Sequence, residues 1–235
     1  MTLRTATQQI LLELENVNQH YTVGNYTIDA LTDVTLTIQQ GEFVVVMGPS
    51  GSGKSTLLNV MAGLERASSG AVRFRKANLA ILSDPELSWL RRHQLGFIFQ
   101  FFNLHPVLNA LENVELPMLI SGVKRKHREP RAIELLKLVN LENRKQHLPH
   151  ELSGGEKQRI GIARALANNP MIILADEPTG DLDSATGQEI MDLLIRLNRT
   201  QGKTIICVTH DDELLAAGMR LIRMEDGRII SDSYL

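Results

Sequence analysis

A glycine-rich loop, residues 48–56 (GPSGSGKST), constrains the fold most strongly, because of what lies on either side of it. The unbroken apolar run before it, residues 43–47, predicts a strand that is buried on both faces, and residues 55–64 predict a helix. Gly51 and Gly53 allow successive backbone N–H groups to turn inward, where a β-branched residue would block a close approach. A strand, such a loop and a helix in this order predict a phosphate-binding site.

The nucleotide-binding residues expected from this loop are Gly48, Pro49, Ser50, Gly51, Ser52, Gly53, Lys54, Ser55 and Thr56. We expect the Lys54 ammonium to reach the β- and γ-phosphates and the Ser55 hydroxyl to bind magnesium. The alternative for the pattern alone is a glycine- and serine-rich surface turn. The strand and helix that flank the loop favour the nucleotide.

Two further buried strands deliver polar side chains to the same edge of the sheet. Residues 171–175 come directly before Asp176 and Glu177. Residues 204–208 are followed by Thr209 and then His210. Ligands bind at the carboxyl ends of the strands in an open α/β sheet. We expect Asp176 to hold magnesium through water, Glu177 to accept a proton from the attacking water, and His210 to contact the γ-phosphate and Glu177. Two solvated acids and a structural histidine are the alternatives.

A second glycine-rich turn, Leu152, Ser153, Gly154, Gly155 and Glu156, opens another helix that is expected to run to about residue 168. Helix N-termini attract anions, so this turn could add donors to a phosphate. It has no lysine in the loop position and no buried strand before it, so we do not expect it to hold a nucleotide alone. The alternative is an ordinary helix cap, with Ser153 as the N-cap.

The chain of 235 residues suits one α/β domain with a mainly parallel sheet, because buried strands alternate with helices. The alternation in residues 30–38 predicts an N-terminal antiparallel β part, and Asp226-Gly227 predicts a closing hairpin. Prolines punctuate a mostly helical stretch from about residue 83 to 168. We therefore expect an ATP-binding core of residues 10–98 and 166–235 with an inserted helical subdomain, residues 99–165.

Composition limits the partners and the compartment. A formal net charge of −2 gives no basic field for nucleic acid, and the basic run 124–128 is read as a solvated surface rather than a lipid or nucleic-acid patch. One cysteine excludes a disulfide framework and suits a reducing compartment. No leader is visible, and no apolar run approaches the roughly 18 residues of a membrane span, so a membrane part is expected on another chain.

The order of these motifs resembles the ATP-binding subunit of an ABC transporter over nearly the whole chain. The loop, the 152–156 turn followed by Lys157-Gln158-Arg159, the Asp176-Glu177 pair, residues 181–183 and His210 occur in the order of that family. The resemblance implies a P-loop NTPase fold, an ATPase that uses ATP and Mg²⁺, and a homodimer that closes on two ATP molecules. It also implies that Ser153 and Gly155 of one copy cover the ATP bound by Lys54 of the other.

The resemblance assigns further roles, residue by residue. Gln100, after residues 96–99 (GFIF), matches the glutamine loop and is expected to sense magnesium and support catalysis together with Lys54. Tyr21 resembles the aromatic residue that stacks on adenine, and Tyr26 is a nearby competitor. Asp183 matches the aspartate of the dimer loop.

Residues 103–117 and 175–180 resemble the subgroup that serves lipoprotein release, macrolide export and cell division. Asp181 departs from that subgroup, which usually has asparagine there. The resemblance implies a permease subunit on a separate chain, a place on the cytoplasmic face of the cell membrane, and export, extraction or force transmission. A soluble ABC ATPase, such as an iron–sulfur assembly scaffold, is the alternative.

Overall fold

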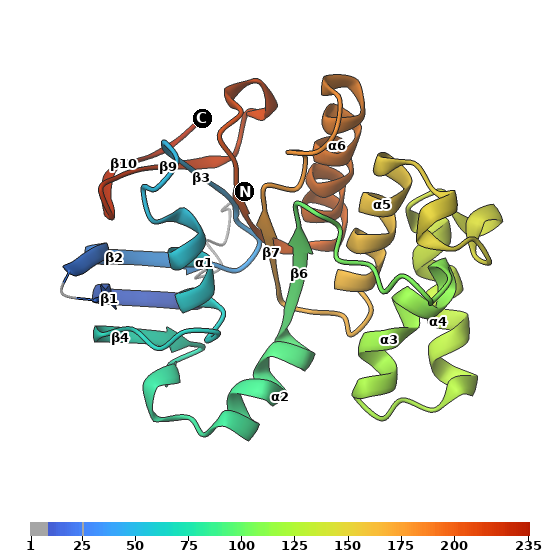
Figure 1. The fold of residues 1–235 in the computed structure, drawn as a ribbon, viewed down its shortest axis with the longest axis horizontal. Coiled ribbons are helices and arrows are strands. Elements are labelled where there is room, and N and C mark those ends of the chain that lie inside the picture. The colour runs from blue at the N-terminus through green and yellow to red at the C-terminus, as the bar shows by residue number, and fades with distance from the viewer. Residues whose placement is uncertain (1–8, 25) are drawn as a thin grey trace, which may run out of the picture.

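The computed structural model describes residues 9–24 and 26–235, in which an antiparallel sheet lies on one side of a larger central sheet and a group of helices lies on the other (Figure 1). From one edge to the other, the larger sheet contains β10 (Arg228–Tyr234), β9 (Arg220–Glu225), β3 (Phe43–Met47), β8 (Thr204–Val208), β7 (Ile172–Asp176) and β6 (Leu95–Phe99). The pairs from β9 to β6 are parallel, and only β9 and β10 pair antiparallel. The α/β fold with a mainly parallel sheet is therefore confirmed.

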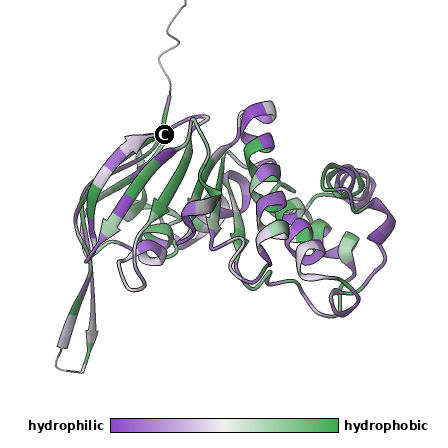
Figure 2. Cartoon of the chain, turned by 90° about the horizontal axis from the view of Figure 1, so that it is seen from above, coloured by the Kyte–Doolittle hydropathy of each residue, from purple (hydrophilic) through white to green (hydrophobic). Residues whose placement is uncertain are grey.

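The smaller sheet is antiparallel. It contains β2 (Tyr26–Gln39), β1 (Ile10–Val23), β4 (Ser69–Phe74) and β5 (Ala77–Asn78) in that order. The far end of the long β1–β2 hairpin stands away from the rest of the molecule (Figure 2). This sheet confirms the predicted N-terminal antiparallel part, and it adds β4 and β5, which the sequence did not predict.

Six α-helices surround the sheets in the described residues. They are α1 (Lys54–Met61), α2 (Asp84–Gln94), α3 (Ala110–Ile120), α4 (Arg125–Leu138), α5 (Gly154–Ala165) and α6 (Ser184–Gln201), with short 3₁₀ turns at Leu79–Ile81, Glu142–Arg144, Pro149–Glu151 and Asp212–Leu214. Helices α3, α4 and α5 pack together on the side of the larger sheet that lies away from the antiparallel sheet (Figure 1).

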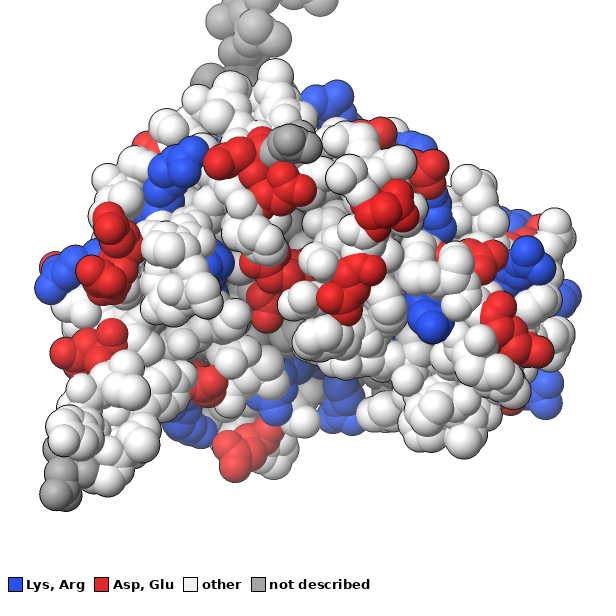
Figure 3. Space-filling model, turned by 45° about the horizontal axis from the view of Figure 1, so that its top comes forward, with Lys and Arg blue, Asp and Glu red and all other residues white. Residues whose placement is uncertain are grey.

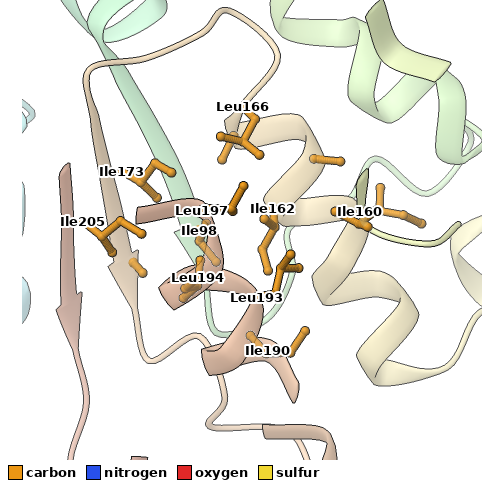
Figure 4. Packing of buried hydrophobic residues seen from close by; sticks show 14 of the residues in the cluster. Ile98, Ile160, Ile162, Leu166, Ile173, Ile190, Leu193, Leu194, Leu197 and Ile205 are labelled. Carbon is orange, nitrogen blue, oxygen red and sulfur yellow. The ribbon is translucent and has the colours of Figure 1, made fainter. Parts of the chain in front are cut away.

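The central strands read as unbroken apolar runs because each face of the larger sheet is covered. Alternate residues of β3, such as Val44 and Val45, enter two different apolar clusters. One cluster joins the sheet to α1, α2 and the antiparallel sheet. The other joins it to α5 and α6, where Ile98 and Ile173 of the sheet lie near Leu194 of α6 (Figure 4). Both faces are therefore buried, as a parallel sheet requires.

The prediction of a mostly helical middle is wrong at residues 95–99, which form β6. This short apolar stretch has no periodicity that separates strand from helix. It becomes a strand because it pairs with β7, from Leu95 beside Ile172 to Phe99 beside Asp176. Pro117 also lies inside a helix, α3, rather than ending one, because helix packing outweighs the loss of one backbone donor.

The separation of residues 99–165 as a subdomain stays a prediction. One apolar cluster runs without a break from α3 and α4 through α5 to α6 and the sheet. In the described part of the chain, no helix combines the length and the apolar character needed to cross a membrane. On the face drawn in Figure 3, acidic and basic side chains are interspersed, and acidic ones gather near its centre.

Candidate nucleotide site

The loop between β3 and α1 turns tightly against two backbone segments. A Cβ atom on Gly48 would lie 2.2 Å from the Met224 carbonyl oxygen, and one on Gly53 would lie 2.3 Å from that of Ala30. Gly53 also has a φ of 94°, in the left-handed region. Glycine is therefore required at both positions, and the loop exposes its backbone toward the start of α1, where the helix dipole favours an anion.

Lys54 lies at the first position of α1 and is buried. Its Nζ donates to the carbonyl oxygens of Gly48 and Pro49, both at 2.8 Å. These bonds hold the ammonium over the loop that was expected to bind phosphate. The ammonium can exchange the two carbonyls for phosphate oxygens, because an anion makes stronger charge-assisted bonds.

The Ser55 hydroxyl and the Asp176 carboxylate lie next to each other beside the loop, and both could serve as oxygen ligands. The Ser55 hydroxyl donates to Oδ1 of Asp176 at 3.4 Å. Burial raises the pKa of the Asp176 carboxyl, and the charge of Glu177 raises it further, while Ser55 and Lys54 act in the opposite direction. A cation would offset that cost, and Mg²⁺ is typically held by one or two carboxylates together with phosphates and water. The hydroxyl and carboxylate therefore fit Mg²⁺.

Glu177 and His210 meet at the ends of neighbouring strands. The Glu177 backbone N–H donates to the Val208 carbonyl at 2.9 Å, and its φ of 46° turns the chain away from the sheet. Nδ1 of His210 lies 3.0 Å from both carboxylate oxygens of Glu177. The hydrogen bond and the charge of Glu177 raise the pKa of His210. The predicted contact between these two residues is therefore present.

One cavity of about 580 Å³ collects the predicted residues from three separate parts of the chain. It is lined by Ile28, Asp29, Ala30, Ser50, Gly51, Gly53, Lys54, Ser55, Thr56, Glu177 and His210. The sequence did not point to residues 28–30 of β2, which enter the lining because the antiparallel sheet packs over the loop. Within the described residues, the lining includes no part of the Leu152–Glu156 turn.

Tyr21 and Gln100 form other contacts in this structure. Tyr21 lies outside the lining of the cavity and its hydroxyl donates to Glu65, whereas Tyr26 is highly exposed on the hairpin. Nε2 of Gln100 donates to Oδ1 of Asp181 at 3.1 Å. Stacking on adenine by Tyr21 and magnesium binding by Gln100 stay predictions.

Asp183 caps α6. Its Oδ1 accepts from the Thr186 N–H at 3.0 Å, and its Oδ2 accepts from the Thr186 hydroxyl at 2.7 Å. The Thr186 hydroxyl and N–H together lower the pKa of the Asp183 carboxyl. The side chain thus fixes the start of the helix, and its role in a dimer stays a prediction.

The second glycine-rich turn is held by a capping box at the start of α5. The Ser153 hydroxyl accepts from the Glu156 N–H at 3.2 Å, and Glu156 accepts from the Ser153 N–H at 2.9 Å. Arg144 donates to the same Glu156 carboxylate at 3.0 Å. A Cβ on Gly155 would lie 2.5 Å from the Thr186 methyl, so glycine lets the turn pack against α6. Ser153 is therefore the N-cap of α5, as the alternative for this turn describes, and the contribution of the turn to a phosphate stays a prediction.

The sequence interpretation named Gln158 and Asp181 only as parts of motifs and assigned neither of them a contact at the site. Gln158 is fully buried between α5 and the sheet, and Asp181 accepts the bond from Gln100. Gln158 lies four residues before Ile162, so it falls on the buried stripe of α5. A polar residue on an apolar helix face was the available signal.

A phosphate-binding loop, an acid pair and a histidine at the ends of adjacent parallel strands define a P-loop ATPase. The profile described as "ABC transporter" matches residues 31–180. The chain belongs to the ABC transporter family and is an ATP-binding, ATP-hydrolysing subunit.

The relatives agree with this assignment. The chain is 50% identical over 229 residues to the ABC transporter ATP-binding protein MJ0796 of Methanocaldococcus jannaschii, covering 96% of this chain and 97% of the relative. It is 46% identical over 222 residues to the lipoprotein-releasing system ATP-binding protein LolD of Geobacter metallireducens, covering 94% and 99%. It is 48% identical over 223 residues to the macrolide export ATP-binding/permease protein MacB of Nitrobacter winogradskyi, covering 95% of this chain but 34% of that one.

A solved structure supports the fold and the reaction. The dimeric post-hydrolysis structure of the MJ0796 cassette, bound to ADP and Pi, superposes with a TM-score of 0.87 at 48% identity, over 96% of this chain and 99% of that one. The named relatives favour a transporter subunit over a soluble scaffold.

Proposed function

We propose that two copies of this chain close around two ATP molecules, each copy supplying half of each site. The observation that carries this proposal is the composition of the cavity. Its lining contains Lys54, Glu177 and His210, but within the described residues nothing from Leu152–Glu156. That turn is itself a helix N-terminus, so in a head-to-tail dimer it can add donors to the γ-phosphate of the other copy.

The proposed chemistry assigns one task to each side chain. Glu177 accepts a proton from water as the water oxygen bonds to the γ-phosphorus and the bond from the γ-phosphorus to the bridging oxygen breaks, which releases ADP and phosphate. His210 holds the Glu177 carboxylate in place through its contact at 3.0 Å. Lys54 and the loop N–H groups stabilise the charge on the phosphates.

Ser55 and Asp176 would hold Mg²⁺, and Gln100 would approach it once the dimer closes. When bound, the ion would supply positive charge that offsets the negative charge of the phosphates. Asp181 orients the Gln100 amide from the other side, because its carboxylate accepts from Nε2. Asp183 fixes the start of α6, beside the Leu152–Glu156 turn, at the proposed dimer interface.

We further propose that a cytoplasmic helix of a separate membrane subunit docks in a groove between the core and α3. The groove has a volume of about 270 Å³, and its lining includes the apolar Phe97, Phe99 and Ile120 together with the basic Arg91, Arg92 and Arg164. An amphipathic helix that carries acidic residues on one side fits this combination of surfaces. LolD and MacB, by their names, serve lipoprotein release and macrolide export. Export, extraction or force transmission at the cytoplasmic face of the membrane is therefore the proposed work.

The composite site is tested by replacing Ser153 with arginine. We expect Ser153→Arg to lower kcat about 100-fold, because a bulky cation would block closure over the γ-phosphate, while ATP binding to the monomer stays unchanged. Wild-type activity per molecule should rise with protein concentration as dimers form. Turnover and nucleotide affinity are measured across a dilution series.

Ser83→Arg is the matched control, since Ser83 caps α2 with the same kind of box, closed by Glu86. It should leave kcat unchanged. Activity that is independent of concentration and insensitive to Ser153→Arg would exclude the composite site.

The docking groove is tested by placing a carboxylate at residue 120. Ile120 and Ile230 are almost equally exposed, at 57% and 58%, but Ile120 lines the groove and Ile230 lies on β10. We expect Ile120→Asp to reduce recovery of the chain with the membrane fraction about tenfold, because a buried unpaired charge weakens an apolar contact. Ile230→Asp should have no effect. Equal recovery of the two variants would exclude this groove.

A further inference from the structure

Within the described residues, Gln158 is the α5 side chain that donates hydrogen bonds both to the backbone segment that carries Gln100 and to the segment that carries Glu177. Its Nε2 donates to the carbonyl oxygen of Phe99 at 3.2 Å and to that of Pro178 at 2.5 Å. Phe99 immediately precedes Gln100, and Pro178 immediately follows Glu177. One amide group therefore joins the helix that begins at Ser153 to the residues proposed to sense the metal and to accept the proton.

These two carbonyls lie where the sheet ends. The strands β6 and β7 pair up to Phe99 and Asp176, and no strand pairing continues beyond these residues in the described part of the chain. Glu177 leaves the sheet with a positive φ, and its carbonyl accepts from the Gly180 N–H. The Gln158 amide supplies donors at the point where strand pairing no longer does, so it sets the separation of the two loops.

The oxygen of the Gln158 amide, Oε1, indicates why a glutamine occupies this position. The Gln158 side chain is completely buried, and its Oε1 has no hydrogen-bond partner among the described residues. Because both neighbours of the amide are carbonyls, the nitrogen must face them, and the oxygen is left unpaired. An apolar side chain would fill this space without burying an unpaired oxygen. The two donated bonds are thus the property that glutamine adds here.

We propose that Gln158 is a positioning residue that couples α5, the helix that begins behind Ser153, to Gln100 and Glu177. When Leu152–Glu156 engages the ATP of the partner copy, any displacement of α5 passes through the Gln158 amide to the backbone on both sides of the cavity. The residue is proposed to contact neither ATP nor the attacking water. It acts by fixing the position of the Glu177 carboxylate relative to the Gln100 amide. This inference rests on the proposed roles of Ser153 and Glu177.

The test is Gln158→Met, which keeps the length of the side chain and removes both the donors and the unpaired oxygen. We expect kcat to fall about 10–100-fold, because a shift of about 1 Å in a catalytic group has that effect. The KM for ATP should stay within about twofold, since Gln158 does not line the cavity. ATP-dependent dimer formation, measured in the Glu177→Gln background, should be unchanged.

Asn113→Leu is the matched control. Asn113 is also fully buried, and its amide donates to the carbonyls of His105, Leu108 and Asn109, but it lies in α3, away from the cavity. Its loss should lower the midpoint of thermal unfolding and leave the kcat of the folded protein unchanged. Gln158→Met should show the reverse pattern.

A Gln158→Met enzyme with kcat within about twofold of wild type overturns the proposal. So does a loss of activity that parallels a loss of folded protein, because that result makes Gln158 a structural residue like Asn113. If Glu177→Gln hydrolyses ATP normally, the proposed function itself is wrong. If Glu177→Gln is inactive while Gln158→Met is fully active, only the coupling through Gln158 fails.

Discussion

The two glycine-rich turns of this chain both open helices, yet they are built for different tasks. At the first, α1 begins at Lys54 without a side-chain cap, and the ammonium is buried within the loop. At the second, α5 begins behind Ser153 with a complete capping box, and Ser153 is exposed. The first turn thus combines backbone donors with a positive charge inside a cavity. The second presents a rigid, capped helix end to the outside.

This difference teaches why glycine alone does not identify a nucleotide site. At the first turn, glycine is required by close approach to the antiparallel sheet and to β9. At the second, Gly155 is required because α5 packs against Thr186 of α6. In the part of the chain that the structure describes, the first turn lies beside the strand-end carboxylates Asp176 and Glu177, and the second lines no part of that cavity. On the proposed function, the second turn would meet a phosphate that a second copy carries.

The largest effect is expected on the rate of hydrolysis, in a variant that should hold both turns on one unhydrolysed ATP. Glu177→Gln removes the proton acceptor but keeps the shape of the site, so we expect hydrolysis to fall about 10³-fold, within the usual range for loss of a general base. ATP binding should persist, and an ATP-bound dimer should accumulate. Single-turnover hydrolysis and light scattering at increasing ATP concentrations measure the two properties.

Adding Ser153→Arg to Glu177→Gln should abolish that dimer, because the second turn could no longer cover the phosphate. Glu134→Gln serves as the control, since Glu134 is exposed on α4 and pairs only with Arg131 in the described residues. It should hydrolyse ATP normally. A trapped dimer that persists with arginine at position 153 would contradict the assigned role of the second turn.

A smaller effect is expected from removing the cation of the first turn. Lys54→Met should weaken ATP binding about 10–100-fold, the value of one or two charge-assisted hydrogen bonds. Lys203 is the matched control, because its Nζ also donates to a backbone carbonyl, that of Pro170 at 2.9 Å, at the start of the strands. Lys203→Met should lower stability without changing ATP affinity, as measured by calorimetric titration. If Lys54→Met and Lys203→Met lowered the affinity for ATP equally, the Lys54 ammonium would have only a structural role and would not bind phosphate directly.

The sequence predicted the parts of this fold that depend on local pattern. Unbroken apolar runs identified β3, β7 and β8, and their common direction placed Glu177 and His210 at one edge. These inferences succeed because burial on both faces is visible in a single strand and parallel strands end together.

The parts that were missed depend on long-range contacts. Strand β6 exists because β7 pairs with it, and residues 28–30 line the cavity because the antiparallel sheet packs over the loop. The hydrogen bond from Gln100 to Asp181 joins residues 81 positions apart, so no local pattern contains it. Contacts between two copies follow from no local pattern either, and the sequence suggests them only through its resemblance to a family whose members pair.

The smallest expected effect concerns a titration beside the first turn. Glu177 raises the pKa of His210, so an NMR titration should give His210 a pKa above the usual value of about 6.5. Glu177→Gln should bring it back toward that value, whereas Glu134→Gln should not. The contact stabilises the fold fully below the unfolded pKa of His210, and this contribution is lost as the pH rises through the folded pKa. Because the His210 side chain is 71% exposed, solvent screening keeps that contribution small. A His210 pKa that does not respond to Glu177→Gln would show that the imidazole does not hold the carboxylate in solution.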